Sequence, residues 1–134
     1  MPPEINEHGA CLFVSAEDSI DIIRYRVYHI CKAMNLTEKQ EKYVANHLFV
    51  EDVTGRIARF VEADQQNNLV FNDHPQQLID AYKGKDIKMV MLDPAMFFSP
   101  GERFVNDAEA ALMQVARNIS KGLGGAAVGY IHHT

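Results

Sequence analysis

The sequence contains no tryptophan, only two cysteines, and no apolar run near the roughly 18 residues that a membrane-spanning helix needs. Basic residues are fewer than acidic ones: the sequence has 13 lysines and arginines and 18 aspartates and glutamates, which gives a net charge of −5. This balance disfavours a broad basic surface for nucleic acid, although it leaves room for a local basic loop. Cys11 and Cys31 have neither metal nor redox spacing. We therefore expect a cytoplasmic protein with reduced, buried thiols and no membrane contact.

Apolar and polar segments alternate in an order typical of α/β proteins. Short apolar runs that stop at acids predict buried strands, whereas apolar residues at helical spacing predict helices. The expected elements are strand 10–14, helix 19–34 capped by Asp18 or Ser19, helix 37–47 with a Thr37–Gln40 capping box, strand 48–50, a hairpin insertion within 54–72, helix 73–84, strand 88–93, helix 106–122 and strand 126–131. We predict one α/β domain over residues 1–134, with a mainly parallel sheet of about four strands between helices.

Polar, chemically useful residues follow these strands at the point where each one ends. The carboxyl ends of parallel strands meet at one edge of the sheet, where α/β proteins place their sites. That edge is expected to carry Glu17, Glu51, Asp52, Asp93, His132 and His133. The sequence thus predicts a rim of acids and histidines.

Two carboxylates at such a rim point to a divalent cation. Asp93 and Glu17 end separate strands, and neighbouring carboxylates repel each other unless a cation or proton lies between them. Mg²⁺ prefers one or two carboxylates together with phosphate oxygens and waters. A Glu that does not bind the metal could orient an attacking water as a base. The alternative for Asp93 is a purely structural carboxylate that caps loop amides, and for His132 and His133 a polar end of a buried strand.

Three short segments, 13–18 (FVSAED), 90–94 (VMLDP) and 129–134 (GYIHHT), occur in one order and spacing. Together they resemble the RecA-like ATPase core of the hexameric RepA-type replicative helicases of plasmids and phages, over residues 9–134. The resemblance implies ATP and Mg²⁺ as cofactors, single-stranded DNA as a partner, and a homo-oligomer, as a hexamer in the parent protein.

The resemblance also implies roles for individual residues. Glu17 resembles the glutamate that activates the hydrolytic water, and Asp93 the Walker B aspartate that holds Mg²⁺ through water. His132 or His133 resembles the sensor between the nucleotide and the DNA-binding loop. Two further roles are expected: Arg26 at the subunit interface, and Arg103, within the channel-facing loop 97–106, on DNA phosphate.

One motif of that family is missing. Its ATPases cradle the phosphates with a Walker A loop, Gly-x-x-x-x-Gly-Lys-Ser/Thr, and this sequence contains none. We expect the chain to be the central part of a larger three-layer αβα ATPase, with the P-loop strand missing and with neither hydrolysis nor tight Mg-ATP binding of its own. The last strand would then be an open edge, through which the chain is expected to associate with itself.

Other functions fit parts of the sequence. A degenerate, non-catalytic ATPase-like interaction or assembly module would need no Walker A loop. A phosphohydrolase with Asp93 as nucleophile would usually show a second aspartate at position 95, which is Ala95 here. Zinc could bind the potential ligands His8, Cys11, His132 and His133, although no paired spacing supports such a site.

Some apolar residues carry no functional signal. Met89, Met91 and Met113 are expected to fill the core. Tyr25, Tyr28 and Phe60 could stack on nucleic-acid bases, but burial or contact with another subunit is the favoured interpretation.

Overall fold

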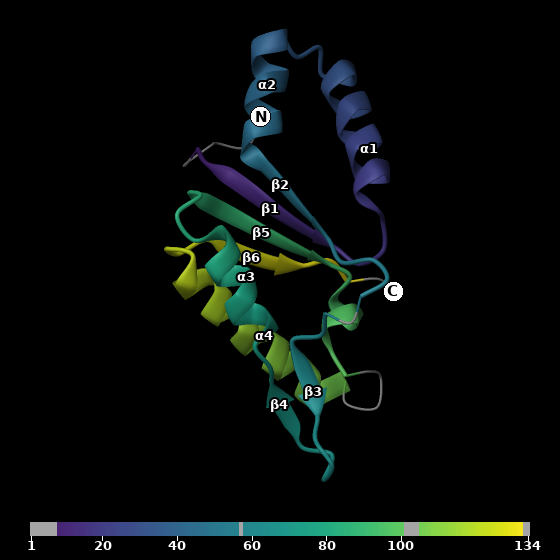
Figure 1. The fold of residues 1–134 in the computed structure, drawn as a ribbon, viewed down its shortest axis with the longest axis vertical. Helices are drawn as coiled ribbons and strands as arrows, with labels where there is room; N and C mark the ends of the chain where they lie inside the picture. The colour runs from purple at the N-terminus through teal and green to yellow at the C-terminus, as the bar shows by residue number, and fades with distance from the viewer. Residues whose placement is uncertain (1–7, 57, 101–104, 133–134) are drawn as a thin grey trace.

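A computed structural model describes residues 8–56, 58–100 and 105–132. Its centre is a parallel sheet of β1 (Ala10–Ser15), β2 (Leu48–Asp52), β5 (Ile87–Asp93) and β6 (Ala127–Tyr130), in the order β2-β1-β5-β6 (Figure 1). Each strand is a short apolar run, as expected for strands buried in a parallel sheet. The predicted four-stranded parallel sheet is confirmed.

Helices flank the sheet, as in the αβα arrangement of RecA-like proteins. The helices are α1 (Ile20–Ala33), α2 (Glu38–His47), α3 (His74–Tyr82) and α4 (Val105–Gly122), and a short 3₁₀ helix, η1 (Ala95–Phe98), follows β5. Figure 1 shows α3 and α4 together on one side of the sheet, whereas α1 and α2 stand as a pair at the β2 end. The predicted α/β fold class is confirmed.

Local signals explain where several elements begin. Thr37 and Gln40 form the expected capping box, because each side chain accepts a hydrogen bond from the other residue's backbone amide, at 3.2 and 2.9 Å. Pro75 occupies the first turn of α3, where its missing amide costs nothing. The hairpin predicted within 54–72 is an antiparallel pair, β3 (Val61–Ala63) and β4 (Leu69–Phe71).

The core lies between the sheet and the α3–α4 layer. Leu12, Val14, Val90 and Leu92 project from the central strands into it, and none is more than 2% exposed. From α4, Val115 and Ile119 pack against this cluster. Phe60, at the base of the hairpin, stacks on Phe98 of η1 at a centroid distance of 4.6 Å, which confirms its predicted burial and joins the hairpin to the core.

The opposite face of the sheet is less covered, and the predictions that Cys11, Met89 and Met113 are buried were wrong. Cys11 and Met89 alternate with the buried residues of their strands and are exposed, Met89 by 44%. Cys31 is buried, as predicted. Met113, on the outside of α4, is 54% exposed. Tyr25 and Tyr28 are also exposed. Sequence hydrophobicity does not indicate which face of an element is covered.

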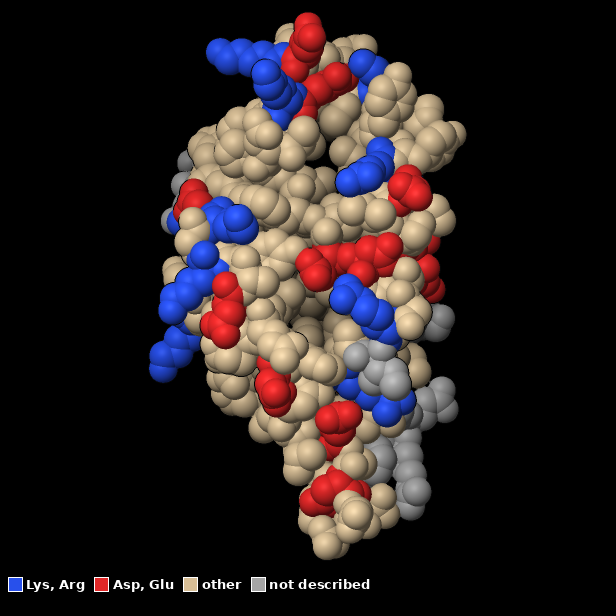
Figure 2. All heavy atoms as spheres, in the orientation of Figure 1, with Lys and Arg blue, Asp and Glu red and all other residues tan. Residues whose placement is uncertain are grey.

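On the face shown in Figure 2, lysines and arginines are interspersed with aspartates and glutamates. This face therefore carries no broad surface of basic residues alone, as the composition indicated. No helix in the described residues is long and apolar enough to cross a membrane.

Candidate functional site

Three neighbouring strands end in register at one edge of the sheet. Ser15 of β1 is the register partner of Asp93 in β5, and Leu92 is the partner of Tyr130 in β6. Beyond the strands, the amide of Ala16 donates to the carbonyl oxygen of Asp93 at 2.9 Å, and the amide of Ala95 donates to that of Ile131 at 2.8 Å. Because these bonds extend the sheet, Glu17, Asp93 and His132 all belong to the same rim.

Asp93 is the most enclosed carboxylate of this rim. It ends the apolar run of β5, and only 7% of its surface is exposed. An aspartate is rarely buried to this extent unless a hydrogen bond, an opposite charge or a metal ion accompanies it. Asp93 has an interaction partner, so its burial does not by itself require a metal ion.

The turn that carries Glu17 is fixed by Ser15, whose role the sequence analysis missed. Ser15 is fully buried; its hydroxyl donates to the carbonyl oxygen of Asp18 at 2.8 Å and accepts from the amide of Asp18 at 3.1 Å. These two bonds close the 15–18 turn and set the path of the backbone through Glu17. A serine at the end of an apolar strand, three residues before an Asp, was the available signal.

Asp52 has a structural function at the rim. One of its carboxylate oxygens accepts from the amide of Ile20 at 3.0 Å, and the other accepts from the amide of Thr54 at 2.9 Å and from the Thr54 hydroxyl. Hydrogen bonds from Thr54, and then from Ile20, lower the pKa of Asp52. Ser19, one of the two predicted residues, is the N-cap of α1, but its side chain makes no capping hydrogen bond, and the carboxylate of Asp52 accepts the bond from Ile20 instead.

Glu51 points to a different neighbour. The Tyr82 hydroxyl donates a hydrogen bond to its carboxylate, and Arg56 Nη2 lies 3.9 Å from Glu51 Oε1. Burial, and then the bond to Glu51, raise the pKa of Tyr82 above its usual value. Glu51 therefore ties β2 to α3 rather than completing the Glu17–Asp93 pair.

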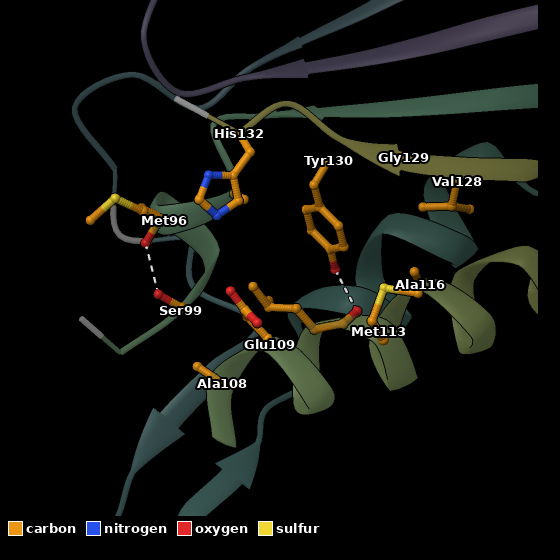
Figure 3. A pocket seen from close by; sticks show the side chains of 12 residues that line it. Met96, Ser99, Ala108, Glu109, Met113, Ala116, Val128, Gly129, Tyr130 and His132 are labelled. Atoms are coloured by element: carbon orange, nitrogen blue, oxygen red, sulfur yellow. Dashed lines mark hydrogen bonds between the residues drawn. The ribbon is translucent and has the colours of Figure 1, made fainter. Parts of the chain in front are cut away.

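A cavity of about 670 Å³ lies beside the rim, between η1, α4 and β6. Figure 3 shows His132 and Glu109 on opposite sides of it and Tyr130 pointing to α4, where its hydroxyl donates to the carbonyl oxygen of Leu112 at 2.8 Å. Burial raises the pKa of Tyr130. The lining residues are Ala95, Met96, Ser99, Ala108, Glu109, Leu112, Met113, Ala116, Val128, Gly129, Tyr130 and His132. Most of them are apolar, so the cavity suits apolar side chains better than phosphate groups.

The remaining predicted site residues have different outcomes. Arg26 lies on α1, where Nη1 pairs with Asp18 Oδ2 at 2.6 Å and the side chain stays 59% exposed. Arg103 and His133 lie outside the described residues. Among the residues that are described, no three His, Cys, Asp or Glu side chains gather as metal ligands, so His8, Cys11 and His132 do not form the zinc site considered from the sequence.

The rim carries the residue types of a magnesium- and water-handling site. Asp93 offers carboxylate oxygens of the kind that Mg²⁺ or its waters bind, and Glu17 offers a base one strand away. Among known protein families, a model described as an AAA domain matches residues 2–134, nearly the whole chain. No curated protein matches the chain.

Proposed function

The chain belongs to the AAA domain family, a P-loop ATPase-like family, and we propose that it forms the magnesium- and water-handling part of an ATPase related to RepA-type replicative helicases. The observation that carries the proposal is the register of β1 and β5, since it places Glu17 and Asp93 at the ends of adjacent strands. Domains of this family generally use ATP and Mg²⁺.

In this proposal Asp93 would hold Mg²⁺ through a coordinated water, and its burial restricts the directions in which its oxygens could bind. Mg²⁺, when bound, neutralises the charge that develops on the transferring phosphoryl group. Glu17 orients the attacking water and accepts its proton. The hydrogen bonds of Ser15 hold the Glu17 turn in place, which keeps this base in position.

His132 is the proposed sensor. It lies two residues past the end of β6, and the amide of the intervening Ile131 donates to the carbonyl oxygen of Leu92 at 2.8 Å, so the histidine is coupled to the strand that carries Asp93. A change at the nucleotide could pass along this connection to the loop 97–106, where Arg103 would contact DNA phosphate. His133 is the alternative sensor.

The phosphate cradle must come from outside these 134 residues, because the sequence contains no Walker A motif. In RecA-like domains the Walker A strand lies beside the sensor strand, and β6 has an open edge in the described chain. The proposed parent protein therefore supplies a P-loop at this edge. By its relation to RepA-type helicases, we propose that this parent assembles as a hexamer and translocates single-stranded DNA. The exposed Arg26 would then face a neighbouring subunit.

Calorimetric titration of this chain with Mg-ATP tests whether the groups that bind the phosphates lie outside it. We expect no binding at millimolar nucleotide, because backbone amides and a lysine for the β- and γ-phosphates are missing. Micromolar binding would overturn the proposal, since the phosphates would then be held by groups other than a P-loop.

A non-catalytic assembly module is the second candidate, and the missing Walker A motif is the observation that favours it. Hydrolysis distinguishes the two candidates. In a protein that carries this chain together with a P-loop, the ATPase proposal requires turnover that depends on Glu17, whereas the module requires none.

A further inference from the structure

Glu17 lies in a short connection whose two ends are both held by the segment that follows β2. The connection runs from Ser15, the last residue of β1, to Ile20, the first residue of α1. At its start, the carbonyl oxygen of Ser15 accepts from the amide of Val53 at 2.8 Å. At its end, the amide of Ile20 donates to Asp52 Oδ2 at 3.0 Å. Residues 52 and 53 therefore fix the connection on both sides of Glu17.

The carboxylate of Asp52 is itself oriented by the residues that follow it. Its Oδ1 atom accepts from the amide of Thr54 at 2.9 Å and also from the Thr54 hydroxyl. Arg56 Nη2 donates to the carbonyl oxygen of Asp52 at 2.6 Å. These bonds restrict rotation of the Asp52 side chain, so that Oδ2 is directed at the first amide of α1. Thr54 thus orients the carboxylate, and the carboxylate holds the helix.

This contact does more than an ordinary helix cap does, because its two groups lie on different elements. Ser19 occupies the N-cap position of α1, but its side chain makes no capping hydrogen bond. A carboxylate near the N-terminus of a helix is favoured by the free amides and by the helix dipole. Asp52 ends β2, so it caps α1 and also fixes the start of that helix relative to the sheet.

A displacement of α1 would reach Glu17 through the residue next to it. Arg26, on α1, pairs with the carboxylate of Asp18 at 2.6 Å, and the Ser15 hydroxyl bonds to the backbone of Asp18. The backbone at Glu17 therefore follows α1 on one side and β1 on the other. Because a shift of about 1 Å in a catalytic group can cost about 100-fold in rate, a base at this position requires a fixed start of α1.

We propose that Asp52 is a positioning residue for the activation of water by Glu17. Through the amide of Ile20 it holds the start of α1, and with it the Glu17 turn, in the arrangement in which Glu17 accepts the proton of the attacking water. This inference rests on the proposed ATPase function, in which Glu17 is the base. Asp52 acts only through Glu17, so its loss should lower kcat and leave the binding of Mg-ATP unchanged.

Asp52→Ala tests this role by steady-state kinetics in a protein that contains this chain and a P-loop. We expect kcat to fall by about 10- to 100-fold, with the KM for Mg-ATP and the Mg²⁺ dependence nearly unchanged. Asp52→Asn should retain more activity than Asp52→Ala, because its side-chain oxygen can still accept from the amide of Ile20. Thr54→Val, which removes only the hydroxyl bond to the carboxylate, should lower kcat less than Asp52→Ala does.

Asp64→Ala is the matched control. The Asp64 carboxylate also accepts from two backbone amides, those of Gln66 and Asn68 at 2.9 and 2.8 Å, but it lies in the turn of the projecting β3–β4 hairpin (Figure 1). This change should leave kcat unaltered. Circular dichroism and thermal unfolding show that each variant is folded at the assay temperature.

A double-mutant cycle with Glu17→Gln separates positioning from general structural damage. A residue that acts only through Glu17 has nothing to position once the base is lost, so Asp52→Ala should cost little further activity in the Glu17→Gln background. Equal losses in both backgrounds would overturn the inference. An unchanged kcat in Asp52→Ala, beside a lowered kcat in Glu17→Gln, would overturn the positioning role alone. If Glu17→Gln leaves turnover unchanged, the proposed ATPase function falls and this inference falls with it.

Amide hydrogen exchange on this chain, measured by NMR without nucleotide, tests the contact independently of catalysis. In Asp52→Ala we expect the amides of Ile20 and Asp18 to exchange about tenfold faster or more, because the Ile20 bond to a charged acceptor is lost and the turn beside it loosens. The amides of β5 should keep their protection. Unchanged exchange at Ile20 and Asp18 would contradict the inference, whatever the kinetic assays give.

Discussion

Ala16 and Asp93 are joined at the rim of the sheet, where the amide of Ala16 donates a hydrogen bond to the carbonyl oxygen of Asp93 over 2.9 Å. This bond continues the β1–β5 ladder one residue past the end of β1. It fixes the backbone immediately before Glu17 relative to the backbone of Asp93. The two candidate residues therefore keep their relative position through main-chain contacts, which do not depend on a bound ligand.

Glu17→Gln tests the proposed base. In a protein that contains this chain and a P-loop, we expect turnover of ATP to fall by about 100-fold or more, the usual effect of losing a general base. Binding of Mg-ATP should stay nearly unchanged, since the amide keeps the shape of the side chain. Steady-state hydrolysis and nucleotide titration measure the two quantities. Glu38→Gln, an exposed change on α2, serves as the control. Equal turnover in Glu17→Gln would remove Glu17 from the mechanism.

Asp93→Asn tests magnesium binding at the same site. Loss of the carboxylate charge should raise the Mg²⁺ concentration needed for half-maximal hydrolysis by about 10- to 100-fold, the scale found for residues that hold a metal through its ligands. The measurement is the Mg²⁺ dependence of ATPase activity in the protein that carries a P-loop. Asp107→Asn on exposed α4 makes the matched comparison. If the Mg²⁺ dependence of the two variants agrees, Asp93 does not contribute to metal binding.

Ser15→Ala tests the turn beneath Glu17. Ser15 is fully buried and makes two hydrogen bonds to Asp18, so its loss should lower the free energy of unfolding by about 1–3 kcal/mol. Chemical denaturation of this chain gives the value. The control is Ser19→Ala, because the Ser19 side chain makes no capping hydrogen bond and its removal should change stability by about 0.5 kcal/mol or less. Similar losses in both variants would show that the Ser15 bonds are not specific.

Asp52→Asn tests the capping of α1 through its pH dependence. Hydrogen bonds from Thr54 and Ile20 lower the pKa of Asp52 in the folded state. A carboxyl group with a depressed folded pKa contributes stability above its unfolded pKa of about 4, and this contribution is lost as the pH falls through the folded value. The unmodified chain should therefore be more stable than Asp52→Asn at neutral pH, and the difference should shrink below about pH 4.

Thermal unfolding of the two proteins at a series of pH values measures this difference. Asp64→Asn, which changes a carboxylate in the exposed β3–β4 turn, shows whether any acid effect is specific to the α1 cap. A difference between Asp52→Asn and the unmodified chain that stays constant with pH would contradict the depressed pKa.

The strands could be predicted because their signal is local. β5 is an apolar run that ends at Asp93, and the Thr37–Gln40 pair that begins α2 lies within four consecutive residues. The rim followed from the same pattern, since parallel strands that end in polar residues place those residues at one edge. Glu17, Asp93 and His132 were found in this way, because their position depends only on strand direction.

Burial was harder to predict because it depends on distant residues. Met89 and Val90 are neighbours in an apolar run, yet Met89 is 44% exposed and Val90 is fully buried, since only one face of β5 lies under the α3–α4 layer. The expectation that both were core residues treated the run as covered on both sides. Cys11 on β1 is exposed for the same reason, whereas Met113 is exposed because it lies on the outside of α4.

The sequence by itself determined the order of strands and helices and the acids and histidines at the strand ends, because these depend on spacing over a few residues. The tertiary structure determined which partner each carboxylate at the rim binds. Asp52 caps a helix that begins 32 residues earlier, and Glu51 contacts a tyrosine 31 residues later. Such contacts require two remote segments to meet in a particular orientation. Only the packing of the whole chain provides that information, and it also decided that an apolar cavity lies beside the rim, between η1, α4 and β6.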